Sequence, residues 1–240
     1  MTVSTSRAPD RIAGMFDAIA RRYDTLNHLL TAGIDRRWRR RAIRELAFSG
    51  RESVLDVCTG TGDMAIEAVT SGHGAAREAV GIDFAGEMLH YAQRKVRRDA
   101  LDAKVRLVRG DATSLPVPDG RFDAATVGFG IRNVVNMPRA LAEFHRALRP
   151  GGQLAILEFG APELPIIRTC YRWYFTYVLP RIGRGISKHS EAYDYLPASV
   201  ETFPKPPAFV TLLQAAGFKD VRAVPLSFGI VYLYVAVKRG

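Results

Sequence analysis

Apolar and polar positions follow two patterns along this chain, and the change between them falls near residue 53. Before it, apolar residues recur at helical spacing, as in the stretch that contains Ile12, Met15, Phe16 and Ile19. After it, short apolar runs alternate with amphipathic stretches. The pattern predicts strands over 53–58, 79–83, 104–109, 122–127 and 153–158, and helices over 63–71, 85–98 and 138–148. This alternation predicts an α/β fold with a doubly wound, mostly parallel sheet.

The segments before and after this alternating region have their own patterns. A basic amphipathic helix is expected over 34–48, with five arginines between Arg36 and Arg41 placed around Trp38. A helix over 208–216 and strands near 221–225 and 230–237 would complete a seven-stranded sheet, the last two as a hairpin. Residues 161–203 are rich in aromatic residues and proline, so we expect a lid or binding insertion, or else a hydrophobic cluster over the sheet. The whole chain, 1–240, is expected to be one domain.

Composition bears on the partners of the protein and on its location in the cell. The chain carries 34 Lys and Arg against 24 Asp and Glu, a net charge of +10, which suits an anionic partner such as nucleic acid, phospholipid or an acidic substrate, or simply a protein of high pI. Two cysteines indicate no disulfide framework and fit a reducing cytoplasm. The N-terminus lacks an apolar signal core, and no apolar run reaches the roughly 20 residues of a membrane span. We therefore expect a cytoplasmic protein.

A glycine-rich turn follows the first strand of the alternating region. It contains Gly60, Thr61 and Gly62, and the next strand ends at Asp83, a spacing that lets a carboxylate reach a ribose. The pattern predicts a nucleoside cofactor at the carboxyl ends of parallel strands, either a dinucleotide or S-adenosylmethionine. A dinucleotide is disfavoured because about 50 residues precede the turn, and because two later landmarks fall outside its pattern, Gly110-Asp111-Ala112 and Arg149-Pro150-Gly151-Gly152.

These landmarks in order resemble the class I methyltransferases. The resemblance implies S-adenosylmethionine as cofactor, with the glycine-rich loop at its methionine part, Asp83 at the ribose hydroxyls and Asp111-Ala112 at the adenine. Cys58 departs from the pattern, because many relatives have their first glycine there. The cofactor-binding residues implied in this way are Asp56, Gly60, Thr61, Gly62, Asp83, Asp111, Ala112 and Gly128.

A finer resemblance covers almost the whole chain. Its motifs are Met15-Phe16-Asp17, Arg22-Tyr23-Asp24 with Asn27, Arg37-Trp38-Arg39, Phe129-Gly130-Ile131-Arg132-Asn133-Val134, Leu157-Glu158-Phe159, and Tyr193 to Ser199 with Phe203-Pro204. They resemble the menaquinone and ubiquinone C-methyltransferases. The resemblance implies methylation of a prenylated hydroquinone, with demethylmenaquinol favoured over 2-methoxy-6-polyprenyl-1,4-benzoquinol because Gly128 is serine in many ubiquinone-pathway relatives.

Ring methylation requires a proton acceptor and a group that stabilises a phenolate. Arg132 is a candidate for the phenolate partner, with a structural salt bridge as the alternative, and Asn133 would either orient the hydroxyl or cap the next turn. Tyr23, Asp24 and Asn27 would close over the substrate from an N-terminal cap over 1–50, or simply end a helix. Tyr193 and Tyr195 would line the ring pocket or pack among other aromatics. The reaction requires no metal, and no Cys/His cluster has ligand spacing.

Two other classes of protein compete with this interpretation. A nucleic-acid methyltransferase would fit the charge, but the chain has Gly128-Phe129-Gly130-Ile131 where amino-group methylation of bases usually needs an Asn/Asp-Pro-Pro-aromatic tetrapeptide. A nonenzymatic binding module is disfavoured because the motif residues are intact. The expected partners are therefore a prenylated quinol and, through the basic helix around Trp38 and the aromatic stretch 171–179, the anionic inner face of a membrane, without nucleic acid. A homodimer stays open.

Overall fold

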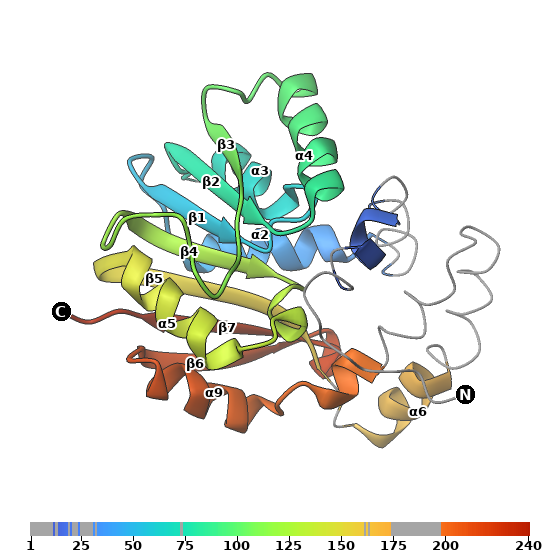
Figure 1. The fold of residues 1–240 in the computed structure, drawn as a ribbon. Helices are drawn as coiled ribbons and strands as arrows, with labels where there is room; N and C mark the ends of the chain where they lie inside the picture. The colour runs from blue at the N-terminus through green and yellow to red at the C-terminus, as the bar shows by residue number, and fades with distance from the viewer. Residues whose placement is uncertain are drawn as a thin grey trace.

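The fold is built around a twisted sheet with helices on both faces (Figure 1). The computed structural model describes residues 12, 14–18, 20, 24, 31, 33–72, 74–160, 162, 164–173 and 198–240. In this part of the chain seven strands form one sheet in the order β3-β2-β1-β4-β5-β7-β6. The strands are β1 (Ser53–Val57), β2 (Glu78–Asp83), β3 (Val105–Arg109), β4 (Phe122–Gly128), β5 (Leu148–Phe159), β6 (Lys219–Leu226) and β7 (Val231–Val237).

Pairing of the strands confirms the predicted architecture. All pairings among β1 to β5 are parallel, whereas β7 is antiparallel to both β5 and β6. The last two strands do pair with each other, but β7 lies inside the sheet and β6 forms its edge. The order reverses at β1, which lies between β2 and β4, and such a switch point is where open α/β sheets place their ligands.

The helices cover the sheet in two groups. They are α2 (Asp35–Glu45), α3 (Asp63–Thr70), α4 (Gly86–Arg98), α5 (Met137–Ala147), α6 (Pro165–Trp173) and α9 (Pro206–Ala215), with short 3-10 turns η1 (Ile131–Asn133) and η3 (Ser227–Gly229). One apolar cluster joins α2, α3 and α4 to the sheet, and another joins α5 and α9 to its opposite face. Successive residues of β1 alternate between the two clusters, Val54 in the first and Leu55 in the second, because side chains of a strand point to opposite faces.

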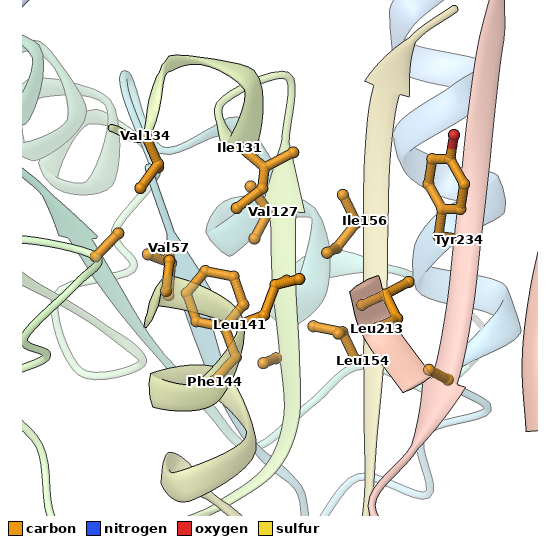
Figure 2. Packing of buried hydrophobic residues seen from close by; sticks show 14 of the residues in the cluster. Val57, Val127, Ile131, Val134, Leu141, Phe144, Leu154, Ile156, Leu213 and Tyr234 are labelled. Carbon is orange, nitrogen blue, oxygen red and sulfur yellow. The ribbon is translucent and has the colours of Figure 1, made fainter. Parts of the chain in front are cut away.

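The core under α5 explains why that amphipathic stretch forms a helix. Leu141 and Phe144 lie on one side of it and point at Val127 of β4, while Leu154 and Ile156 continue the same layer on β5 (Figure 2). Asn136 precedes the helix and its side-chain oxygen accepts a hydrogen bond from the Arg139 backbone N–H at 3.1 Å, an N-cap. Burial of one face and a capped end together position the loop between β4 and α5.

Helix α2 is the basic helix that the sequence predicts, but its orientation overturns one expectation. Trp38 is only 7% exposed. Its ring lies 6.1 Å from that of Phe129, and its Nε1–H donates to the Ser227 hydroxyl at 2.9 Å. Trp38 therefore packs into the protein and is not available for a membrane interface, because the apolar side of α2 faces the sheet.

Candidate functional site

A cavity of about 290 Å³ opens where β1, β2 and β4 end. Its walls come from the turn after each of these strands, from the start of α4 and from the N-terminal segment. The residues with predicted cofactor roles that line it are Gly60, Asp83, Asp111, Ala112 and Gly128. The cavity therefore lies at the switch point of the sheet and collects five of the eight predicted cofactor residues.

The glycine-rich turn has the backbone shape that its sequence demands. Cys58 has φ +54°, in the left-handed region that favours glycine, which explains why a glycine would suit this position. Its side chain leaves no room opposite, since a Cβ at Gly130 would lie 2.3 Å from the Cys58 Cβ. The backbone of the turn after β4, at Gly130, is thus packed against the Cys58 side chain of the turn after β1, and both residues line the cavity.

Asp83 connects the end of β2 to this turn. Its carboxylate accepts the Gly60 N–H at 2.7 Å and the Ala85 N–H at 2.9 Å. Burial raises the pKa of Asp83, while the backbone donors oppose the shift. Because the carboxyl group lines the cavity, its oxygens are placed to accept hydrogen bonds from a ligand diol.

Asp56, predicted to bind the cofactor, does not line this cavity. It is fully buried in β1 and accepts hydrogen bonds from the hydroxyls of Thr59, at 2.5 Å, and Thr126, at 2.8 Å. Burial raises its pKa to about 6, against the lowering effect of those donors. Its contact with Thr59 holds the turn after β1 in shape, and its contact with Thr126 joins β1 to β4.

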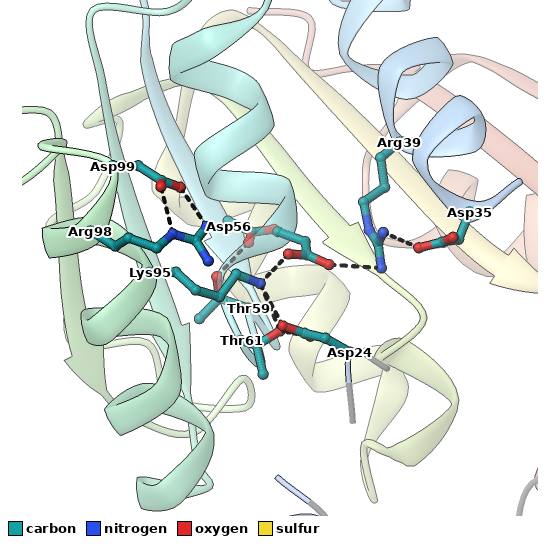
Figure 3. Close-up of polar contacts among 10 residues, drawn as sticks. Asp24, Asp35, Arg39, Asp56, Thr59, Thr61, Lys95, Arg98 and Asp99 are labelled. Carbon is teal, nitrogen blue, oxygen red and sulfur yellow. Dashed lines mark hydrogen bonds and ion pairs between the residues drawn. The ribbon is translucent and has the colours of Figure 1, made fainter. Parts of the chain in front are cut away.

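Thr61 and Gly62 also face away from the cavity. The Thr61 hydroxyl donates to Asp24 at 2.5 Å (Figure 3). A Cβ on Gly62 would lie 3.2 Å from that of Ala92, so this glycine allows α4 to approach the turn closely. Both residues support the loop from the side opposite to the cavity.

Several residues of the cavity were not singled out by sequence reasoning as site residues. Ile12 and Phe16 come from the N-terminal segment, Phe84 from the loop after β2 and Met88 from the first turn of α4. Phe16 lies within the Met15-Phe16-Asp17 motif and Phe84 follows Asp83 directly, so both carried a signal. They add apolar walls beside Asp83 and the Gly110–Ala112 turn, which suits the flat face of a nucleobase.

The turn after β4 brings Asn133 to the cavity and keeps Arg132 behind it. Asn133 lines the cavity. The N-cap of α5 is Asn136, and the predicted alternative, that Asn133 caps the next turn, stays a prediction. Phe129, at the start of this turn, has φ +61°, a strained conformation for an aromatic residue.

Arg132 holds this strained turn in place. Its guanidinium donates to the Phe129 carbonyl oxygen and, at 2.7 Å, to Glu158 at the end of β5. It also lies 5.5 Å over the ring of Phe159. Arg132 is not among the residues that line the cavity. The salt bridge that the sequence left as an alternative is therefore present, and a direct contact with substrate is not what this geometry favours.

Of the other predicted catalytic and substrate residues, the structure describes only Asp24. Asp24 does not line the cavity and is bound to Thr61 and Lys95. Tyr23, Asn27, Tyr193 and Tyr195 fall outside the described residues. Within the described ranges, no group of three His, Cys, Asp or Glu side chains is arranged to hold a metal ion.

The residues present fit S-adenosylmethionine. Asp83 offers a carboxylate for ribose hydroxyls, the backbone around Gly60 allows close approach of the amino-acid part, and Phe84, Met88 and Ala112 offer apolar walls for adenine. A doubly wound seven-stranded sheet with β7 antiparallel and this cavity at its switch point defines a class I methyltransferase.

Comparison with known proteins identifies the family. A model of the ubiE/COQ5 methyltransferase family matches residues 2–238. A ubiquinone/menaquinone biosynthesis C-methyltransferase of a Geobacter species is 46% identical over 233 residues, 97% of this chain and 98% of the relative. A demethylmenaquinone methyltransferase of Thermus thermophilus is 47% identical over 221 residues, 92% of this chain and 98% of that protein.

A solved structure agrees with the fold. A SAM-dependent methyltransferase from Aquifex aeolicus has a TM-score of 0.60 and 19% sequence identity, over 83% of this chain and 89% of that chain. The chain belongs to the ubiE/COQ5 methyltransferase family and is an S-adenosylmethionine-dependent methyltransferase.

Proposed function

We propose that this protein methylates a ring carbon of a prenylated hydroquinone in quinone biosynthesis, with demethylmenaquinol as the favoured substrate. The observation that carries the proposal is full-length similarity to C-methyltransferases of ubiquinone and menaquinone biosynthesis. Glycine at position 128, where the ubiquinone branch often has serine, supports the menaquinone branch. A substrate of this kind needs apolar surface, and Ile12, Phe16, Val134 and Val135 supply it as part of the cavity lining.

The bound cofactor would supply a methyl group on a sulfonium, and the chain's own residues would position the acceptor carbon against it. Asp83 and the Gly60 turn hold the donor. Asn133 faces the cavity and is our candidate to hydrogen-bond the ring hydroxyl beside the reacting carbon. We assign Arg132 to positioning, because Glu158 neutralises its charge and the same guanidinium holds the Phe129 carbonyl that shapes the Asn133 turn.

The experiment is incubation of the purified protein with isotope-labelled S-adenosylmethionine and one acceptor at a time. The acceptors are a short-chain demethylmenaquinol, a 2-methoxy-6-prenyl-1,4-benzoquinol and total cellular RNA. Label on the ring of the first acceptor supports the proposal, and label on both quinols would widen it to both branches. Label on RNA alone, or on none of the three with a folded and cofactor-binding protein, would overturn it.

The prenyl tail is insoluble in water, so we also propose peripheral contact with the cytoplasmic face of an anionic membrane. None of the described helices is long and apolar enough to cross a membrane. Helix α6, within the predicted insertion 161–203, exposes Ile166 at 80% and Trp173 at 60%. These two residues are seven apart and share one helix face, and the exposed Arg168 lies between them in the sequence.

Vesicle flotation tests this membrane contact. Ile166→Ser with Trp173→Ser should weaken binding to vesicles that contain phosphatidylglycerol, whereas Val108→Ser, an exposed apolar residue on β3, should not. High salt should also weaken binding, since anionic lipid attracts basic residues by about 1 kcal/mol each. Equal binding by the double variant and the parent would place the contact elsewhere on the surface.

A further inference from the structure

A cluster of charged side chains joins the N-terminal segment to the glycine-rich loop on the side away from the cavity (Figure 3). The Lys95 ammonium of α4 lies at its centre. It donates to Asp24 at 2.9 Å, to the Thr61 hydroxyl at 3.3 Å and to Asp63, the first residue of α3. Thr61 in turn donates to the other oxygen of Asp24 at 2.5 Å. Lys95 therefore links the N-terminal segment, the glycine-rich loop and the start of α3 to α4.

A second attachment lies closer to the N-terminus. The Asp17 carboxylate accepts the backbone N–H of Glu87 at 2.9 Å, in the first turn of α4. An acid at this end of a helix also interacts favourably with the helix dipole. Ile12 and Phe16, which line the cofactor cavity, come just before it. The N-terminal segment is thus fastened to α4 at Glu87 and again at Lys95, two turns later.

The cluster continues beyond Lys95 on the side of Asp63. Asp63 also pairs with Arg39 at 3.2 Å, and Arg39 pairs with Asp35. Asp63 therefore keeps a cationic partner if Lys95 is removed, whereas Asp24 would lose the ammonium that faces it. All three side chains of the Asp24–Lys95–Asp63 group are partly buried, so their attraction is less screened than that of a surface pair.

We infer that Lys95 and Asp24 are positioning residues that couple attachment of the N-terminal segment to cofactor binding through Thr61. Thr61 follows Gly60, whose N–H is held by Asp83 in the cavity. A loop ordered by the cofactor presents the Thr61 hydroxyl to Asp24, and attachment of Asp24 keeps Ile12 and Phe16 over the cavity. This gives Asp24 a role other than the catalytic one that its motif suggests. The affinity and protease measurements for this inference rest on the cofactor cavity alone, whereas its turnover measurement rests on the proposed function.

The test compares Asp24→Asn, Thr61→Val and Lys95→Met with Asp220→Asn as a matched control. Asp220 of β6 pairs with Arg239 at 2.9 Å, and this exposed pair is not among the residues that line the cofactor cavity. For the three variants the dissociation constant for S-adenosylmethionine should rise about 10-fold, the scale of one charge-assisted hydrogen bond. Turnover at saturating cofactor should stay within about 3-fold of the parent, and the control should match the parent in both.

Trypsin provides a readout that a merely structural role would not move. S-adenosylhomocysteine should protect the parent and the control against cleavage after Arg21 and Arg22, detected by mass spectrometry, and should protect the three variants much less. The double variant Asp24→Asn/Lys95→Met should weaken cofactor binding no more than the weaker-binding single variant, because both changes break one link. If Lys95→Met fails to fold, the cofactor affinity and protease protection of Asp24→Asn and Thr61→Val still test the inference.

Two results would overturn the inference. The first is a loss of turnover in Asp24→Asn with unchanged cofactor affinity, which would show that Asp24 acts in the methyl-transfer step and not in cofactor binding. The second is unchanged affinity and unchanged protease protection in folded variants, which would leave the cluster without a part in cofactor binding.

Discussion

The guanidinium of Arg132 lies against the carboxylate of Glu158, with Nη1 2.7 Å from Oε1, and both side chains are buried. The pair connects the turn after β4 to the end of β5. Glu158 also accepts the Arg132 backbone N–H at 3.2 Å and the Phe159 N–H at 2.9 Å. Because the same turn carries Asn133 to the cavity, the ion pair helps to fix the position of the group that we propose to contact the substrate.

The losses of stability from removing each partner of this pair should not be additive. Glu158→Gln leaves a buried guanidinium without its counter-ion, so the free energy of unfolding should fall by about 3 kcal/mol. Arg132→Gln should also destabilise, and the double variant should lose less than the two single losses combined. Urea denaturation measures all three. Strictly additive losses would show that the two side chains do not act as a pair.

Asp83 should dominate cofactor affinity. Asp83→Ala removes the acceptor for ribose hydroxyls and for the Gly60 N–H, so S-adenosylmethionine binding should weaken by about 2–3 kcal/mol. Asp83→Asn keeps a neutral oxygen acceptor and should lose less. Calorimetry on both variants checks the order. Binding of NAD in place of S-adenosylmethionine would contradict the cofactor assignment itself.

Gly128 and Met64 should behave as a coupled pair. A Cβ at position 128 would lie 2.9 Å from Met64 Cγ, so Gly128→Ala or Gly128→Ser forces the Met64 side chain to move. We expect a loss of about 1–3 kcal/mol in the free energy of unfolding, as for other overpacked sites. Met64→Ala in the same chain should recover part of that loss. Thermal denaturation of the single and double variants measures it, and no recovery would mean that another neighbour resists the Cβ.

Asp56 should make stability depend on pH in an unusual direction. Its folded pKa of about 6 lies above its ordinary value of 3.8, so the native state holds the proton more tightly than the unfolded chain. This contribution to stability is present at low pH and is lost as pH rises through about 6, by up to about 3 kcal/mol at 1.36 kcal/mol per pKa unit.

The isosteric Asp56→Asn variant does not titrate and isolates this effect. Relative to the parent, its free energy of unfolding should improve as pH rises from about 4 to about 7, because only the parent must ionise a buried carboxyl. Denaturation of both proteins across that range measures the difference. A difference that stays constant with pH would mean that Asp56 keeps an ordinary pKa in the folded protein.

Much of the framework could be predicted from local pattern. The strand that ends in the Gly60 turn, the acid at position 83 and the Gly110–Ala112 turn all appear in the structure at one end of the sheet. They are predictable because parallel strands place their carboxyl ends at the same edge, so the order of motifs along the chain implies their proximity.

The α/β architecture, the family and five of the residues that line the cofactor cavity could be predicted from the sequence, because hydrophobic period and turn chemistry are local properties. The orientation of Trp38, Asp24 and Arg132 could not, because it depends on how distant elements pack. Trp38 faces Phe129, Asp24 faces Lys95 and Arg132 faces Glu158, and each partner is distant in sequence or on another element. A basic or aromatic residue has no fixed partner in a linear motif, since its charge or ring is satisfied by whichever element packs against it.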